Sequence, residues 1–473
     1  MRQIFRQMRW RRLEAVKNGI RSGGPQDNSL ARISFGEKLG YGVGDMANNL
    51  IWTAMSMFVT YFYTDVAGLA AGAVGTMFLI ARVLDAFVDV GVGTMVDRTK
   101  SRYGKARPWL LWMCIPFGIA GVLLFTAPDL SAAGALAYAY VTYLLINIIY
   151  SAINIPYGVL SSMITQDPYQ RSLLNIFRMV MTLIGILIVS TGTLKFVELF
   201  GGGKHGWTWT FGAFGSIAVI MFIITFLTTK ERVRPAVVEK PIPFKRGLGA
   251  LFRNKYWVMI LLLNTLFYGM QAVTSAVNVY YAQYLLGNKD LVGLLSIVQL
   301  IPMMLGLLLL APVIKRFGKR NAALTGMVLM VIGSLIPMID PDNLTVVMIS
   351  TVVKALGQAP LMGTIFAFTA DTVDYGEWKT GMRTEGLIFS ASSFGGKTGT
   401  GFGGALVGWI LAFSGYVGGQ TALSGAASQA IQFLYIFLPA ILCALCAVIL
   451  WFYRLDKEYP KILQELQEVK QMG

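Results

Sequence analysis

The sequence predicts an all-α membrane protein in which twelve transmembrane helices form two bundles of six. The first observation is composition, because 55% of the 473 residues are hydrophobic and only 14% are charged, whereas a soluble protein carries about 25% charged residues. The second is a series of twelve mostly apolar segments of about 20 residues, the length that crosses a bilayer. The third is a long polar connection at residues 229–256, which separates six segments from the other six.

The twelve apolar segments follow one another along the chain with short connections. Several contain Gly or Pro, which membrane helices tolerate better than soluble ones do. We therefore expect a basic tail at residues 1–35, an N-terminal bundle at 36–228, a linker at 229–256, a C-terminal bundle at 257–456 and a second tail at 457–473. The approximate centres of the segments are Ser56, Leu84, Ile119, Ile146, Ile184, Ile220, Gln271, Gln299, Leu329, Leu356, Gly399 and Ala440.

Lys and Arg gather in the even-numbered connections. The second reads DRTKSRYGKARP, the sixth is the long basic one, and the eighth reads KRFGKR, whereas the odd-numbered connections are poor in both residues. Because cytoplasmic loops are enriched in Lys and Arg, we expect the even-numbered connections and both termini to face the cytoplasm of a bacterial inner membrane. This placement accounts for the net charge of +16 without nucleic acid. The basic tail lacks the apolar core of a signal peptide, and we expect it to be solvated or, alternatively, to lie on anionic lipid.

A short internal repeat supports the division into two halves. The second connection contains Arg102-Tyr-Gly-Lys105, and the eighth, six segments later, contains Arg316-Phe-Gly-Lys319. Parallel six-helix halves related by an axis along the membrane normal are a known transporter arrangement.

The second apolar segment carries charges at Arg82, Asp85 and Asp89. Their spacing of three and four residues places them on one face of a helix. Each charge at mid-membrane costs at least ~2.5 kcal/mol, so this face must point into the bundle or into a water-filled cavity. Two carboxylates one turn apart repel, which favours a site for a proton or a cation. The alternative is an ion-pair network that only fastens helices together.

Other polar residues fall within the predicted spans. Asp45 and Asn49 lie in the first, Arg178 in the fifth, Lys354 in the tenth and Lys397 in the eleventh. The fifth and eleventh segments are counterparts in the two halves, so each half contributes one basic residue that suits a polar or anionic ligand. Three aromatic residues could stack on sugar rings, although packing is the commoner role of such residues in membrane helices; they are Tyr150, Tyr157 and Trp378.

Two connections carry candidate gating residues. Gly93-x-x-x-Asp97-Arg98 is similar to the loop between helices two and three in the major facilitator superfamily, where it clamps helix ends; the alternative is a simple basic loop. Asp371, Asp374 and Glu377 fall in the predicted tenth connection, where they could pair with basic loops in a gate that breaks on turnover.

The motifs taken together resemble those of the glycoside–pentoside–hexuronide:cation symporters. The resemblance runs from about Gly36 to Tyr459 and implies the major facilitator fold and import of a glycoside with a cation by alternating access. The motifs are KLGYGVGDMANN, FYTDVAGL, GTMFLIARVLDAFVD, DRTKSRYGKARPWLL, YSAINIPYG and DTVDYGEWKTGMRTEG.

The resemblance also implies roles for individual residues. Asp85 and Asp89 match the acidic pair used for cation coupling and sugar binding. Together with the residues named above, this gives three expected groups. We expect the cation to be coupled by Asp85, Asp89, Asn154 and Ser151, and the substrate to be bound by Asp45, Asn49, Arg82, Asp85, Tyr150, Arg178 and Lys397. We expect gating by Asp97, Arg98, Asp371, Asp374 and Glu377.

Three positions depart from the melibiose-transporting members of the family. Asn154 replaces an acid before the Ile-Pro pair, Asn49 replaces the acid of the first helix, and Gly158 stands where an aromatic residue stacks on the sugar. These departures argue against sodium/melibiose chemistry.

The interior charges suggest an acidic substrate. Four cations, Arg82, Arg178, Lys354 and Lys397, face three anions, Asp45, Asp85 and Asp89, so a glucuronide or other acidic glycoside is the leading hypothesis. A neutral pentoside or oligosaccharide, or an uncoupled facilitator, are the alternatives. A membrane enzyme is disfavoured because the chain has one His and no nucleophile–base pair. We expect no cofactor beyond a transported H+ or Na+, contact with lipid and a functional monomer.

Overall fold

The computed structural model describes residues 32–165, 167–233, 249, 251–381, 385–420 and 423–472. Most of the predicted N-terminal tail and of the linker therefore lies outside the described residues. Every regular element in the described part is a helix. In chain order these are α2 (Phe35–Tyr61), η2 (Phe62–Val66), α3 (Ala71–Arg98), α4 (Arg107–Leu124), α5 (Ala132–Ile164), α6 (Pro168–Leu199), α7 (Gly203–Thr228), α9 (Lys255–Tyr284), α10 (Leu291–Leu308), α11 (Leu310–Phe317), α12 (Lys319–Leu335), η3 (Ile336–Met338), α13 (Leu344–Thr380), α14 (Glu385–Phe413), α15 (Gly425–Gln432), η4 (Phe433–Phe437), α16 (Leu438–Phe452) and α17 (Leu455–Met472).

Short polar side chains begin several of these helices. The side chains of Ser34, Ser131, Asp167, Asn254 and Asn343 each accept a hydrogen bond from a backbone N–H of the first helical turn. Such caps satisfy donors that the helix itself leaves without a partner. The polar residues that flank the apolar segments thus fix where the long helices start.

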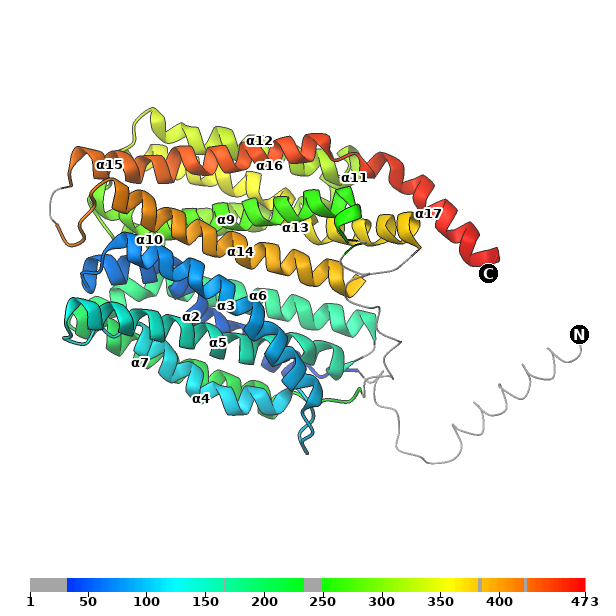
Figure 1. Cartoon of the computed structure of the whole chain (residues 1–473), viewed down its shortest axis with the longest axis horizontal. Coiled ribbons are helices and arrows are strands. Elements are labelled where there is room, and N and C mark those ends of the chain that lie inside the picture. Colours follow the sequence, from blue (N-terminus) through cyan, green and yellow to red (C-terminus); the bar gives the residue numbers. More distant parts are fainter. Residues whose placement is uncertain are drawn as a thin grey trace, which may run out of the picture.

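The helices lie side by side along one long direction (Figure 1). Within the described residues, ten helices are long and apolar enough to cross a membrane. The more polar α2 and the glycine-rich α14 run alongside them, which is consistent with the twelve spans that the sequence predicts. The prediction of an all-α membrane protein is confirmed.

The packing divides the helices into two halves. In the N-terminal half, α2 packs against α6 and α7, and α4 packs against α5 and α7; in the C-terminal half, α9 packs against α14 and α16, and α12 packs against α13 and α16. The halves meet where α3 packs against α14 and α6 against α10. These helices are the second and eleventh, and the fifth and eighth, of the twelve. A two-fold axis that exchanges the halves converts one contact into the other, as expected for parallel repeats.

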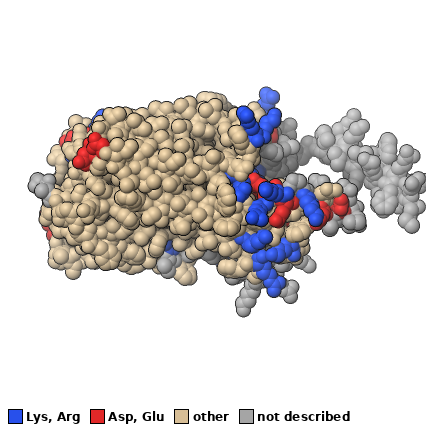
Figure 2. Space-filling view, turned by 90° about the horizontal axis from the view of Figure 1, so that it is seen from above, with Lys and Arg blue, Asp and Glu red and all other residues tan. Residues whose placement is uncertain are grey.

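One end of the molecule gathers the basic connections. The first turn of α2 and the whole of α17 lie at this end (Figure 1), and Lys and Arg cluster over it in the space-filling view (Figure 2). We call it the basic end, defined by the α3–α4 connection at residues 99–106, the segment 229–233 after α7, the turn at Gly318, and α17.

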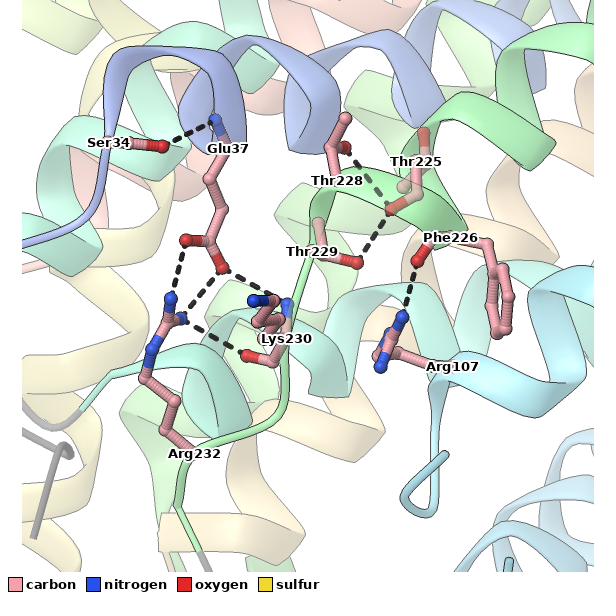
Figure 3. Close-up of polar contacts among 9 residues, drawn as sticks. All are labelled: Ser34, Glu37, Arg107, Thr225, Phe226, Thr228, Thr229, Lys230 and Arg232. Atoms are coloured by element: carbon pink, nitrogen blue, oxygen red, sulfur yellow. Dashed lines mark hydrogen bonds and ion pairs between the residues drawn. The ribbon is translucent and has the colours of Figure 1, made fainter. Parts of the chain in front are cut away.

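Glu37 and Glu231 tie the segment after α7 to the N-terminal half. The Glu37 carboxylate accepts hydrogen bonds from both terminal nitrogens of Arg232, at 2.7 Å and 2.8 Å, and from the backbone N–H of Lys230 (Figure 3). The Glu231 carboxylate accepts from the backbone N–H groups of Lys105, Ala106 and Arg107. The start of the linker is therefore fastened to α2 and to the first turn of α4.

The short sequence repeat has the same local structure in both halves. Gly104 and Gly318 both have positive φ, 108° and 78°, a conformation that glycine adopts at little cost. The guanidinium of Arg102 lies over the ring of Tyr103, and that of Arg316 over the ring of Phe317. The repeat thus marks equivalent turns, as the sequence suggests.

The halves also touch at the end opposite to the basic end. The hydroxyl groups of Thr64 and Tyr280 lie 2.7 Å apart, which joins η2 to α9. The Lys289 ammonium lies 2.7 Å from the Glu198 carboxylate, which joins the segment before α10 to the end of α6. These contacts close the molecule at this end.

Candidate functional site

Arg82 and Asp85 form a buried ion pair on α3. Their side chains are 6% and 7% exposed, and Arg82 Nη1 lies 2.9 Å from Asp85 Oδ2. Arg82 also donates to the side-chain oxygen of Asn147 on α5, at 2.8 Å. A methyl group on Gly401 of α14 would overlap the Arg82 side chain. The methylene groups of Arg82 therefore pack directly against the C-terminal half. Arg82 thus neutralises one acid of the predicted pair.

Asp89 pairs across the interface between the halves. Its carboxylate forms an ion pair with Lys397 of α14. The two side chains are 28% and 29% exposed, compared with 7% for Asp85, so accessibility rises along α3 toward the basic end. Asp89 Oδ1 is buried and has no hydrogen-bond partner within the part of the chain that the structure describes. One carboxylate oxygen at the interface is therefore free to take a proton or a cation.

Asp45 and Arg178 form a third ion pair, between α2 and α6. Arg178 Nε lies 3.2 Å from Asp45 Oδ2, and the Thr182 hydroxyl donates to the same carboxylate. The Asn49 side chain donates to the Asp45 carbonyl at 2.8 Å, and the Arg178 guanidinium lies 5.1 Å from the centre of the Tyr157 ring. This cluster belongs to the N-terminal half alone.

Lys354 is not part of this set. Its side chain is buried between α12 and α13, where its ammonium lies 4.1 Å from the centre of the Tyr435 ring of η4. It forms no ion pair with any of the residues that the structure describes. Lys354 therefore stands apart from the other three interior cations, Arg82, Arg178 and Lys397, each of which pairs with one acid.

Within the described part of the chain, the predicted positions on α5 show no direct polar contact with the acids of α3. Ser151 is buried and Asn154 is half-buried, and no hydrogen bond among the described residues joins either to Asp85 or Asp89. Tyr150 stacks on Trp52 of α2, with ring centres 4.3 Å apart and planes 18° apart. Trp52 was missed by the sequence analysis, although its position three residues after Asn49 places it on the same face of α2.

The other two aromatic candidates have packing roles. Tyr157 is fully buried, stacks on Tyr41 and donates to the Tyr41 carbonyl at 2.6 Å. The Trp378 indole donates to the Glu465 carboxylate at 2.6 Å, at the basic end. Neither lies between the halves.

The predicted gating acids are helical, which corrects their placement in a connection. Asp371, Asp374 and Glu377 all lie in the last turns of α13. Asp371 pairs with Lys319 at the start of α12, and Asp374 accepts from the Tyr459 hydroxyl of α17 at 2.7 Å. No Gly or Pro falls between Gly363 and Gly376, so the helix continues through Asp371 and Asp374, and it is capped by Gly381 in the left-handed conformation. Both contacts stay within the C-terminal half.

The second gating motif lies at the end of α3. Arg98 is exposed in the last turn of this helix. The Asp97 side chain lies outside the described residues.

Comparison with known proteins places this arrangement among sugar carriers. A model of the MFS/sugar transport protein family matches residues 40–457. The isoprimeverose transporter of Lactiplantibacillus pentosus is 40% identical over 92% of this chain and 92% of its own length. Two proteins of Escherichia coli are also similar: a glucuronide carrier protein homolog, 33% identical over 93% of this chain and 97% of its own, and a putative glycoside/cation symporter, YagG, 32% identical over 92% and 96%.

Proposed function

Because the chain belongs to the glycoside–pentoside–hexuronide:cation symporters of the MFS/sugar transport family, we propose that it imports a neutral glycoside containing a pentose, together with a cation. The observation that carries the proposal is the pairing of three interior cations with three acids. Arg82, Arg178 and Lys397 each face one acid, so none of these three cations is left without an acid that an acidic substrate would replace.

The most similar relative reported above supports this substrate class. Its named substrate, isoprimeverose, is a neutral disaccharide of xylose and glucose. A neutral sugar binds through hydroxyl groups, which need both hydrogen-bond donors and acceptors. A carboxylate and an ammonium group that are already paired with each other still have free acceptor and donor positions for these hydroxyl groups. Removing one member of a buried pair is strongly unfavourable, and a neutral substrate does not require the Arg82–Asp85 or Arg178–Asp45 pair to break.

An acidic glycoside is the second candidate, favoured by the relative described as a glucuronide carrier homolog. Its carboxylate would have to displace Asp89 from Lys397 or Asp45 from Arg178. The Asp89–Lys397 pair is the more accessible of the two. An acidic substrate is thus possible only if the coupling cation first neutralises Asp89.

Asp89 is the group that we assign to cation coupling. Its free Oδ1 atom and its partial exposure suit a proton or a sodium ion. A cation on this carboxylate weakens the ion pair across the interface and releases the Lys397 ammonium to donate to a sugar hydroxyl. The sugar and the cation then favour each other's binding, as coupling requires. Ser151 and Asn154 would supply further oxygen atoms from α5.

The orientation follows from charge. We place the basic end and both termini in the cytoplasm of a bacterial inner membrane, because Lys and Arg gather on the cytoplasmic side of membrane proteins. The halves touch at the opposite end, and accessibility rises toward the basic end. With this orientation the geometry supports an inward-facing state, and rocking of the halves would expose the same residues to the outside.

Uptake into proteoliposomes tests the proposal. Isoprimeverose, a xyloside, a glucuronide and melibiose are each offered with an imposed proton gradient, an imposed sodium gradient, or neither. We expect gradient-driven accumulation of isoprimeverose or the xyloside, lost in Asp89→Asn and retained in the matched control Asp342→Asn, which removes an exposed carboxylate. Accumulation of the glucuronide alone would overturn the neutral substrate, and equilibration unchanged by Asp89→Asn would overturn coupling.

A further inference from the structure

One line of α2 remains accessible in an otherwise buried helix. Between Gly44 and Tyr61, the described side chains are buried except along this line, which consists of Met46, Asn49, Trp52 and Ser56. The spacing of three and four residues places them on one face. A face toward lipid would carry aliphatic residues, whereas this one carries an amide, an indole and a hydroxyl. Met46 and Asn49 pack beside Gly185 of α6, whereas Trp52 and Ser56 line a pocket between the halves.

Trp52 forms part of a pocket at the middle of this interface. The pocket has a volume of about 40 Å³ and is walled by residues of both halves, which is room for ordered water. Trp52 and Ser56 of α2, Arg82 of α3, and Thr400 and Gly401 of α14 contribute to its wall. The indole thus lies beside the buried Arg82–Asp85 pair, where a ligand between the halves would meet it.

The indole is held in place but its polar atom is unused. Tyr150 of α5 stacks on it with ring centres 4.3 Å apart, which fixes the plane of the ring. Neither the Trp52 N–H nor the Tyr150 hydroxyl forms a hydrogen bond among the described residues. A rigid aromatic surface with a free donor at its edge suits a sugar ring, which has an apolar C–H face and a rim of hydroxyl groups.

Gly158 leaves open space on the neighbouring helix. It shares one face of α5 with Tyr150 and Asn154, at spacings of four residues, and a methyl group added there would meet no atom within 4 Å. The melibiose-transporting members that this chain resembles carry an aromatic residue at this position. Gly158 therefore supplies no aromatic surface, which leaves the Trp52–Tyr150 stack as the candidate surface for the sugar.

We propose that Trp52 supplies this surface, so that one ring of the substrate stacks on its indole while Tyr150 holds the indole in position. The proposal rests on the proposed function, since it concerns the sugar-binding site of the same transporter. The space beside Gly158, about 12 Å along α5 from Tyr150 at 1.5 Å per residue, is then free for a second ring. Trp52 and Gly158 together would select a two-ring substrate, of which one ring stacks on the indole and the other occupies the space beside Gly158.

Substitution of Trp52 tests the proposal through the KM for isoprimeverose. Trp52→Leu keeps an apolar side chain but removes the aromatic surface, and we expect KM to rise by about tenfold, the effect of one lost aromatic contact. Trp52→Phe should raise KM less, because a smaller ring remains. The control is Trp112→Leu, which removes an exposed tryptophan of α4 and should leave KM unchanged. An unchanged KM in Trp52→Leu would overturn the proposal.

A second readout separates binding from packing. The three native cysteines are buried, so in Ser56→Cys the introduced thiol, one turn from Trp52, is the accessible one. We expect isoprimeverose to slow alkylation of this thiol, and the protection to vanish at the same sugar concentration when Trp52→Leu is added. Protection that survives Trp52→Leu would contradict stacking. If the unsubstituted chain takes up none of the tested sugars, the proposed function itself fails; if it takes up sugar and only the Trp52 effects are absent, that function stands without this surface.

Discussion

The Tyr416 hydroxyl lies 2.7 Å from Asp65 Oδ1 and 2.8 Å from Asp65 Oδ2. Asp65 belongs to η2 in the N-terminal half, whereas Tyr416 follows α14 in the C-terminal half. The Tyr284 hydroxyl donates to the same carboxylate at 2.5 Å, and the Gly419 backbone N–H donates at 3.2 Å. One carboxylate thus collects three donors from the facing half, at the end opposite to the basic end.

Asp65→Asn should weaken closure at this end. Hydrogen bonds to a charged group contribute about 1.5–3 kcal/mol, so loss of the charge should shift the population toward the state open at this end by about tenfold or more. The measurement is alkylation of Thr60→Cys, a buried position in the wall of the central pocket, by a thiol reagent that does not cross the membrane. Labelling should accelerate in Asp65→Asn. The control is Asp129→Asn, which removes an exposed carboxylate paired with Lys204 within one half; equal acceleration there would contradict the role of Asp65.

The two acids of α3 should respond differently to neutralisation. Asp85→Asn leaves the buried Arg82 guanidinium without its carboxylate, and breaking a buried pair costs about 3–5 kcal/mol, so the yield and thermal stability of the purified protein should fall. Asp89→Asn affects a more accessible pair and should remove coupling while stability changes less. Thermal unfolding of both variants, monitored by tryptophan fluorescence, checks the difference. Adding Arg82→Gln to Asp85→Asn should restore part of the stability, and a double variant less stable than either single variant would contradict the pairing.

The sequence predicted which acids share a face but not which cation each one contacts. Helical periodicity suffices to place Arg82, Asp85 and Asp89 together, because it depends only on spacing within one segment. The partner of Asp89 is Lys397, 308 residues away, and this pairing depends on how α3 packs against α14. The spacing of residues within either segment does not predict that these two helices pack together.

Side-chain direction separates Lys354 from Arg178. The residue lies inside an apolar segment, as Arg178 does, so composition treats the two alike. Lys354 points toward α12 and η4, where the Tyr435 ring accommodates its charge, whereas Arg178 points toward Asp45. Rotation of a helix about its own axis decides between these outcomes, and a segment without a clear polar face leaves that rotation open.

This difference predicts unequal effects of two neutral substitutions. Lys354→Met should leave the KM for sugar unchanged, because the side chain does not reach the region between the halves, and should lower stability by about 0.5–2 kcal/mol through loss of the contact with the Tyr435 ring. Arg178→Met leaves Asp45 unpaired beside the substrate site and should raise KM. Uptake kinetics and thermal unfolding on the same preparations measure both effects. A raised KM in Lys354→Met would show that this lysine does reach the substrate.

The Glu231 carboxylate should stabilise the α3–α4 connection, although more than a hundred residues separate the two along the sequence. It accepts three backbone hydrogen bonds of 2.8–2.9 Å at the first turn of α4, where a negative charge also interacts favourably with the helix dipole. Loss of such a cap costs about 0.5–2 kcal/mol. In Glu231→Ala the amide hydrogens of Lys105, Ala106 and Arg107 should therefore exchange with solvent several-fold faster. The control Glu468→Ala removes an exposed carboxylate of α17 and should leave their exchange unchanged. Equal exchange rates in Glu231→Ala and the unsubstituted protein would show that the start of the linker does not hold this connection, and that the turn at Gly104 stabilises itself.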